Sequence, residues 1–230
     1  MRHFFAAVAF FGLFQTTQAF AQNGPVVIEL YTSQGCSSCP PADAMLHDLA
    51  KRDDVIALAL HVDYWDYIGW KDSFAQPAFT ARQHDYARAV NSATVYTPQM
   101  VIGGVDHVIG SRPMQVMDTI QAHSAKGNPV AVSLTRQGEN IQISAQPGGT
   151  GEYVVQLVRY TPEETVAIRR GENAGRNLRY ANIVTSWTVI ERWDGSAPLD
   201  IVAQADGDAP VAVIIQQATN GPIVGAAQLR

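Results

Sequence analysis

The fold is decided by residues 26–43, which read VVIELYTSQGCSSCPPAD. Val26–Tyr31 is a nearly continuous apolar run, which is typical of a strand buried on both faces in a parallel sheet. Small and polar residues follow to Pro41, and Ala42–Arg52 then carries apolar residues at helical spacing. Residues 55–62 form a second apolar run of strand length. The chain is therefore predicted to begin β-α-β, with a right-handed crossover.

Both cysteines of the 230-residue chain lie in this stretch, as Cys36-Ser37-Ser38-Cys39. A cysteine between a buried strand and a helix meets free backbone N–H groups and the positive end of the helix dipole, which lower its pKa. The pattern predicts that Cys36 is the more exposed cysteine and the nucleophile, and that Cys39 resolves the mixed disulfide. Within β-α-β, a CxxC motif indicates thiol–disulfide chemistry more strongly than it does alone.

Two other roles for the cysteine pair stay open. A structural disulfide would close a loop of about four residues, for which the gain in chain entropy is small. A closed zinc site needs four ligands, and the chain has no second cysteine pair, but a copper site could use His61 or His107. We predict no metal and no cofactor, with a binding module that carries a structural disulfide or copper as the alternative to a redox enzyme.

The composition limits the possible partners. The chain has 21 acidic and 16 basic residues, a net charge of −5 and 47% hydrophobic residues. Bulk charge of this sign does not drive binding to phosphate backbones, so no nucleic-acid partner is expected. The high apolar content argues against disorder. We expect a protein or a small molecule that carries a thiol or disulfide as the substrate, and the sequence indicates no particular oligomeric state.

Residues 1–21 are predicted to be a secretory signal peptide. Phe4–Phe14 is apolar apart from a neutral glycine, and Ala19-Phe20-Ala21 is a small-x-small cleavage pattern before Gln22. An apolar core of about 11 residues is too short to span a membrane, so a retained anchor is the less favoured alternative. We expect cleavage after Ala21, no membrane span in the mature chain, and a periplasmic or secreted protein, where disulfides are permitted.

Two further segments are candidates for the same site. Tyr64, Trp65 and Trp70 follow the second strand, at the edge where open α/β sheets bind ligands. These aromatic residues could cover the disulfide or bind a hydrophobic substrate, and packing between two domains is the alternative. Thr97-Pro98 precedes a predicted hairpin. A cis-proline there would leave a strand-like edge open to a substrate peptide, whereas a trans-proline that starts a strand is the ordinary case.

The pattern changes after residue 128. Ser111–Lys126 is predicted to be the last helix, and turn residues separate about eight β-rich runs thereafter, which suggests a β-sandwich. We predict an α/β domain over residues 22–127 and an all-β, sandwich-like domain over residues 128–230. Arg169–Arg179 is interpreted as a solvated loop, with binding of an acidic partner or an interdomain carboxylate as the alternative. The β-rich runs are Val130–Leu134, Ile141–Ala145, Tyr153–Tyr160, Val166–Arg169, Ile183–Ile190, Leu199–Ala203, Val211–Gln216 and Ile223–Ala227.

Glu29–Asp43, His61–Asp72 and Arg169–Arg176 together resemble the exported bacterial thioredoxin-like family known as domain of unknown function 1223. The resemblance covers essentially the whole mature chain. It implies an α/β thioredoxin-like domain followed by a β-rich extension, and an exported thiol–disulfide oxidoreductase. From thioredoxins in general, it implies Cys36 as nucleophile, Cys39 as resolving thiol and Pro98 as a cis-proline. Apart from the resemblance, Thr97, Trp65, Tyr64 and Trp70 are our candidates for substrate binding.

The sequence departs from thioredoxins at two places. Pro40 has no N–H for the first turn of a helix that begins at Cys36, so either that turn is loosened or the regular helix starts near Pro40. Thioredoxins also carry a buried acid six residues before the nucleophile, where this chain has Leu30, and Glu29 is the nearest acid. Burial of Glu29 is costly unless it is paired or protonated. We hypothesise that Glu29 relays a proton for Cys39, and a hydrogen-bonded structural acid is the alternative.

Overall fold

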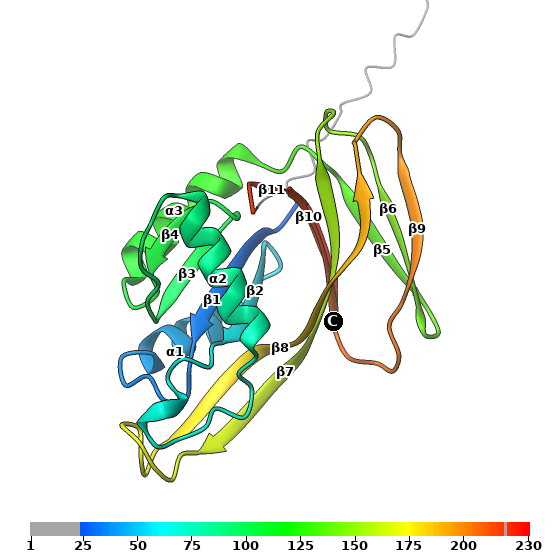
Figure 1. The fold of residues 1–230 in the computed structure, drawn as a ribbon. Coiled ribbons are helices and arrows are strands. Elements are labelled where there is room, and N and C mark those ends of the chain that lie inside the picture. Colours follow the sequence, from blue (N-terminus) through cyan, green and yellow to red (C-terminus); the bar gives the residue numbers. More distant parts are fainter. Residues whose placement is uncertain (1–23, 219) are drawn as a thin grey trace, which may run out of the picture.

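The computed structural model describes residues 24–218 and 220–230 (Figure 1). The predicted signal peptide and its cleavage site lie outside the described residues. No helix in the described part of the chain is long and apolar enough to cross a membrane.

The predicted β-α-β opening is present. β1 (Val26–Thr32) pairs in parallel with β2 (Val55–His61), and both strands are buried at every residue. α1 (Pro40–Leu49) connects them. The predicted hairpin is formed by β3 (Gln99–Ile102), which pairs antiparallel with β1, and by β4 (Asp106–Ile109).

The helices cover the two faces of this part of the sheet. α1 and α3 (Pro113–Lys126) pack on one face, against the side chains of Ile28 and Leu30. α2 (Pro77–Ala89) packs on the other face, after the short 3-10 helix η1 (Asp66–Ile68). The three α-helices of the described residues each carry a proline in the first turn, where its missing N–H leaves no helical hydrogen bond unmade.

The second part of the chain extends the same sheet. β7 (Tyr153–Ala167) and β8 (Asn177–Trp193) form a long antiparallel hairpin, and β10 (Val211–Gln217) and β11 (Ile223–Leu229) continue from β7. The order is β11-β10-β7-β8-β2-β1-β3-β4. A separate three-stranded sheet has the order β5-β6-β9, with bounds Val132–Gln137, Asn140–Ala145 and Leu199–Gln204.

The predicted fold class, an α/β thioredoxin-like domain followed by an all-β sandwich-like domain, is wrong. β8 lies beside β2 in parallel, with Ile183 paired to Ala59, so strands from both parts of the chain share one mixed eight-stranded sheet. The eight predicted β-rich runs overlap the seven strands β5–β11 of the described residues, with β7 predicted as two runs. The pairing of β8 with β2, however, depends on contacts between residues far apart in sequence. The local periodicity of the sequence does not predict such contacts.

The core confirms that the two parts pack as one unit. The cluster on the α2 face takes Tyr31 from β1, Phe79 from α2, Tyr160 from β7 and Ile214 from β10. Strand side chains alternate between faces, so the neighbouring Ile215 points the other way, into a cluster shared with the three-stranded sheet. The sheet is therefore covered on both sides at β10.

Candidate thiol–disulfide site

Ser33–Cys39 connects the end of β1 to the start of α1, and we call this segment the redox loop. The loop turns tightly, because the Ser33 hydroxyl accepts the backbone N–H of Gly35 at 3.1 Å and the Ser33 carbonyl accepts that of Cys36 at 3.1 Å. Cys36 and Cys39 form a disulfide with their Cα atoms 5.4 Å apart. The strand end thus presents one cysteine pair beside the N-terminus of a helix.

The regular helix begins at Pro40, with Cys39 as its N-cap, so the second of the two sequence-based options is correct. The helix dipole acts mainly within the first turn, so Cys36, which lies ahead of the N-cap, feels it less than the sequence motif alone suggests. Both cysteines are buried in the disulfide form, with 2% of Cys36 and none of Cys39 exposed. Ser37 and Ser38 between them are exposed.

Trp65 lies against both the redox loop and the proline segment. Its indole Nε1 donates to the Thr97 hydroxyl at 2.8 Å. Its backbone and Cβ lie so close to Gly35 that a Cβ at that glycine would meet the Trp65 Cβ at 3.2 Å. The Thr97–Pro98 peptide bond is cis, as the resemblance implies. Trp65 and Pro98 therefore lie beside the disulfide segment, at the same end of the sheet.

The other aromatic candidates have different surroundings. Trp70 donates from Nε1 to the Gln34 side chain at 2.8 Å, which places Trp70 on the redox loop. Tyr64 donates to the Gln83 side chain at 3.2 Å and packs against the core on the α2 face. Burial raises the pKa of Tyr64 to about 12. Tyr67 is 79% exposed, and its ring stacks on that of Trp65 with centroids 6.4 Å apart.

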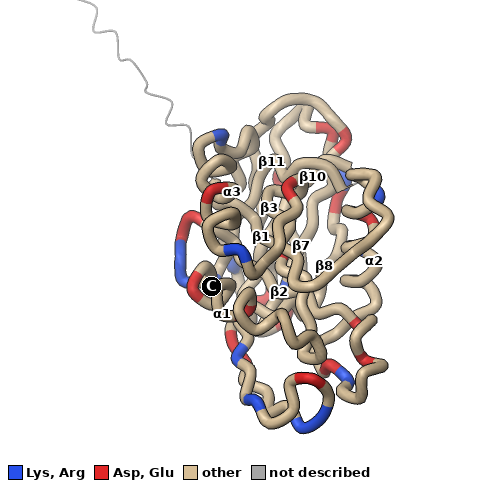
Figure 2. The backbone as a smooth tube through the Cα atoms, turned by 90° about the vertical axis from the view of Figure 1, so that its left-hand side faces the viewer, with Lys and Arg blue, Asp and Glu red and all other residues tan. Residues whose placement is uncertain are grey.

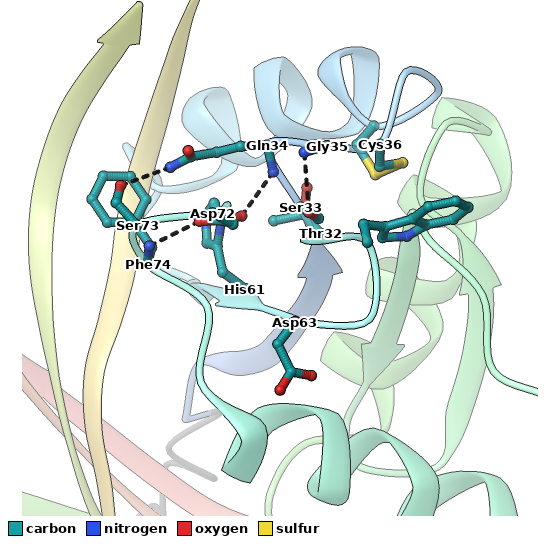
Figure 3. Close-up of polar contacts among 12 residues, drawn as sticks. Thr32, Ser33, Gln34, Gly35, Cys36, His61, Asp63, Asp72, Ser73 and Phe74 are labelled. Carbon is teal, nitrogen blue, oxygen red and sulfur yellow. Dashed lines mark hydrogen bonds and ion pairs between the residues drawn. A yellow bond between two sulfur atoms is a disulfide. The ribbon is translucent and has the colours of Figure 1, made fainter. Parts of the chain in front are cut away.

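A buried carboxylate holds the redox loop from below (Figure 3). One oxygen of Asp72 accepts the backbone N–H of Gln34 at 2.8 Å and lies 2.7 Å from Nδ1 of His61. The other accepts the backbone N–H of Phe74 at 2.8 Å. Burial raises the pKa of Asp72, but His61 and the two N–H groups outweigh it and hold that pKa below its usual value. Asp72 is therefore an ionised anchor for the loop.

Asp43 is a buried acid on the face of α1 that follows the cysteines, and the sequence did not single it out. It lies one helical turn after Cys39, whose carbonyl accepts the Asp43 backbone N–H at 3.1 Å. Thr32 donates to its Oδ1 at 2.7 Å, while its buried Oδ2 has no hydrogen-bond partner among the described residues. Burial raises the pKa of Asp43 from 3.8 to about 7. Its position four residues after Cys39 was the available signal.

Glu29 lies on the opposite face of β1. It shares the α2 face with Val27 and Tyr31, whereas α1 packs against the other face. Both of its carboxylate oxygens bind the Arg82 guanidinium, at 2.7 and 2.8 Å. The hydroxyls of Tyr31 and Tyr86 donate to it at 3.0 and 2.6 Å. The hypothesis that Glu29 relays a proton stays a prediction, and Asp43 is the acid that shares a face with Cys39.

The two histidines considered for copper lie apart from each other in the fold. His61 ends β2, where it binds Asp72 and makes an edge contact with the Tyr180 ring at 4.8 Å. His107 lies on β4, and its Nδ1 is 3.4 Å from the Gln99 side chain. Within residues 24–218 and 220–230, no group of three or more His, Cys, Asp or Glu residues could hold a metal ion.

Comparisons with known proteins place this site in a family. Residues 27–216 match the model of a family described as protein of unknown function (DUF1223). The chain belongs to this family. The chain is also similar to a protein from Agrobacterium tumefaciens whose crystal structure is known. The two share 35% sequence identity and a TM-score of 0.79, over 91% of this chain and 96% of that chain. No curated protein matches the chain.

The DUF1223 match includes every part of the site. It starts inside β1 and extends to Gln216 in β10, so it includes the redox loop, Asp43, the cis Thr97–Pro98 bond and the β7–β8 hairpin. The family match thus includes strands from both parts of the chain, and of the shared sheet only β11 lies wholly outside it.

Proposed function

We propose that this DUF1223 protein is an exported thiol–disulfide oxidoreductase that works by a thioredoxin-like mechanism. The observation that carries the proposal is the Cys36–Cys39 disulfide at the C-terminal end of a buried strand, next to a cis Thr97–Pro98 bond and Trp65. Open α/β sheets bind their ligands at this edge. A substrate that docks at this edge would reach the disulfide from the side of Cys36, which is 2% exposed while Cys39 is fully buried.

The exchange reaction uses only the two cysteines and the substrate disulfide. In the reduced protein, the Cys36 thiolate attacks one substrate sulfur, the substrate S–S bond breaks, and the other substrate sulfur leaves as a thiolate. Cys39 then loses its proton and attacks the Cys36 sulfur of the mixed disulfide. The second substrate sulfur leaves as a thiolate, and two electrons have passed from the protein dithiol to the substrate. The reverse sequence oxidises a substrate dithiol.

Asp43 is suited to accept the proton of Cys39. It shares a face of α1 with that cysteine, it is 5% exposed, and its Oδ2 has no hydrogen-bond partner among the described residues. A carboxyl whose pKa is raised to about 7 takes up and releases a proton near neutral pH. Cys39 has no solvent contact in the disulfide form. If it stays buried when reduced, its thiol needs a nearby group to accept the proton.

Thr97 and the aromatic side chains provide the substrate-binding edge. No backbone hydrogen bond of Thr97 is found among the described residues, so its N–H and C=O can pair with an extended peptide. Trp65 fixes the Thr97 side chain, and Trp70 fixes Gln34 in the redox loop. The half-buried rings of Trp65 and Tyr64 would contact apolar groups that flank the substrate sulfur.

Two measurements test the proposal: trapping of mixed disulfides with substrates, and titration of the Cys36 thiol. Cys39→Ala should hold substrates on Cys36 as mixed disulfides, and Cys36→Ser, the matched control, should hold none. In the reduced wild type, we expect a Cys36 pKa below the free value of about 8.5 and a reduction potential above about −300 mV. An ordinary thiol pKa together with a potential below that value would contradict the proposal and indicate a structural disulfide. Stoichiometric copper that is lost in Cys36→Ser would indicate a binding module.

A further inference from the structure

The loop of the β7–β8 hairpin, residues 168–176, binds directly to the redox loop. Asn173 is 1% exposed, and its Nδ2 donates to two backbone carbonyls, that of Gln34 at 2.9 Å and that of Cys36 at 3.0 Å. The Cys36 carbonyl also accepts the backbone N–H of Cys39, at 3.3 Å. One amide from the far part of the chain therefore holds the peptide unit of Cys36.

Arg176 fixes the orientation of that amide. Its guanidinium donates to Oδ1 of Asn173 at 2.9 Å. A guanidinium has only donors, so it can bind only the amide oxygen, and the NH₂ group must then point at the two carbonyls. The amide cannot flip without losing three hydrogen bonds.

The hairpin loop is itself well ordered by backbone hydrogen bonds. Gly175 donates to the Ile168 carbonyl at 2.8 Å, and Ile168 donates to that of Arg176 at 2.9 Å. A second contact lies at Gly171, which has φ of 75° and where a Cβ would meet the Trp70 Cβ at 3.3 Å. Trp70 in turn binds Gln34, so the hairpin loop contacts the redox loop directly through Asn173 and indirectly through Trp70.

Other charged groups of the hairpin loop have no such role. Arg169 and Arg170 are exposed, and no ion pair or hydrogen bond of their side chains is found among the described residues. Figure 2 shows basic and acidic residues interspersed along the backbone on the side of the molecule that faces the viewer. The specific feature of this loop is the buried asparagine and not its charge.

We propose that Asn173, oriented by Arg176, is a positioning residue that sets the redox properties of Cys36. The proposal rests on the function proposed above. The clamp holds the redox loop in the conformation in which the two sulfurs are bonded. Without it, the loop of the reduced protein would relax, the two thiols would meet less often, and the disulfide would be easier to reduce.

The equilibrium with glutathione measures this effect. Two glutathione thiols reduce the protein disulfide, which yields the protein dithiol and one glutathione disulfide, with two electrons transferred and every proton retained. We expect Asn173→Ala to shift this equilibrium about tenfold toward the dithiol, which is about 30 mV for two electrons. Arg176→Ala should shift it about threefold in the same direction. Asn177→Ala is the control, because Asn177 is exposed and its side chain makes no recorded polar contact in the described chain.

The outcomes separate this inference from the proposed function. A folded Asn173→Ala protein with the wild-type equilibrium and the wild-type pH dependence of Cys36 alkylation would overturn the positioning role. If Asn173→Ala does not fold, Arg176→Ala decides, since Arg176 is exposed and its loss leaves the core intact. A Cys39→Ala variant that traps no substrate overturns the proposed function only, because the equilibria of the wild type and of the Asn173 and Arg176 variants can still be compared with a small dithiol.

Discussion

Glu29 and Arg82 form a bidentate ion pair inside the protein, with the Arg82 Nε and an outer guanidinium nitrogen 2.7 and 2.8 Å from the two carboxylate oxygens. The Glu29 carboxylate is completely buried. Arg82 also donates to Gln156 at 3.3 Å and to Gln216 at 3.1 Å, and its guanidinium lies 4.0 Å from the centroid of the Trp187 ring. One side chain of α2 thus connects β1 to β7, β8 and β10.

Loss of Arg82 should therefore be costly. Arg82→Met leaves a buried carboxylate unpaired, and we expect the free energy of unfolding to fall by about 3–5 kcal/mol. Urea denaturation measures it. The double variant Glu29→Gln/Arg82→Met should lose less than the sum of the two single variants, since no unpaired charge remains. Strictly additive losses would show that the pair is not coupled.

The proton acceptor for Cys39 can be identified by comparing two acids. Asp43→Asn should slow exchange and change its pH dependence between pH 6 and 9, because the variant cannot accept a proton near the resolving thiol. Glu29→Gln should leave the pH dependence as in the wild type, because Glu29 is on the other face of β1. The measurement is the rate of mixed-disulfide resolution in stopped flow. The opposite result would restore Glu29 as the relay.

Asp43 should also make stability depend on pH. Its pKa is raised from 3.8 in the unfolded chain to about 7 in the fold, so the folded protein binds the extra proton between these values. Its contribution is complete below about pH 4 and is lost as the pH rises to about 7. Relative to Asp43→Asn, the wild type should lose on the order of 4 kcal/mol at most over this range. Denaturation of both proteins at several pH values checks it, and parallel curves would contradict it.

Asp72 should contribute to stability in the opposite pH range. Its pKa is lowered in the fold, so its contribution is present above the unfolded value and is lost as the pH falls through the folded value. Asp72→Ala leaves the backbone N–H groups of Gln34 and Phe74 and the ring of His61 without their acceptor. We expect a loss of about 3 kcal/mol at pH 7. A loss that is unchanged at pH 3 would argue against an ionised anchor.

The predicted export gives a direct test. Expression of the full chain in a bacterium should give a mature protein that begins at Gln22, found outside the cytoplasm. Intact-mass measurement and N-terminal sequencing check the position. A protein that keeps residues 1–21 in the soluble cytoplasmic fraction would contradict the prediction.

The sequence predicted local elements well and their long-range pairing badly. The β-α-β opening, the hairpin after Pro98 and the last helix follow from periodicity and turn residues. The sequence predicts two runs, Tyr153–Tyr160 and Val166–Arg169, where the structure has the single strand β7. Pro162 lies between the two runs, and β10 pairs with β7 only as far as Arg159. Pro162 therefore lies where that side of the strand needs no N–H donor. The β2–β8 contact left no local pattern at all.

For the site residues as well, the sequence predicted local features and missed contacts between distant segments. Cys36, Cys39 and the Thr97–Pro98 bond were found because a short motif and a family resemblance carry them. Asp43 was passed over because an acid in the first turn of a helix is ordinary. Asn173 was read as part of a solvated loop, since a contact across the fold with the Cys36 carbonyl has no signature in a hydrophilic segment.

The shared sheet has a consequence for how the molecule comes apart. β7, β10 and β11 supply part of the hydrophobic core that covers β1 and β2. A fragment that ends before β5 would therefore expose apolar side chains of β1 and β2 to solvent. We expect the whole chain to melt in one cooperative step, with no thioredoxin-sized intermediate. Any change that destabilises the C-terminal strands would then also destabilise the segment that holds the cysteines. The state of the disulfide would therefore depend on the stability of the entire protein.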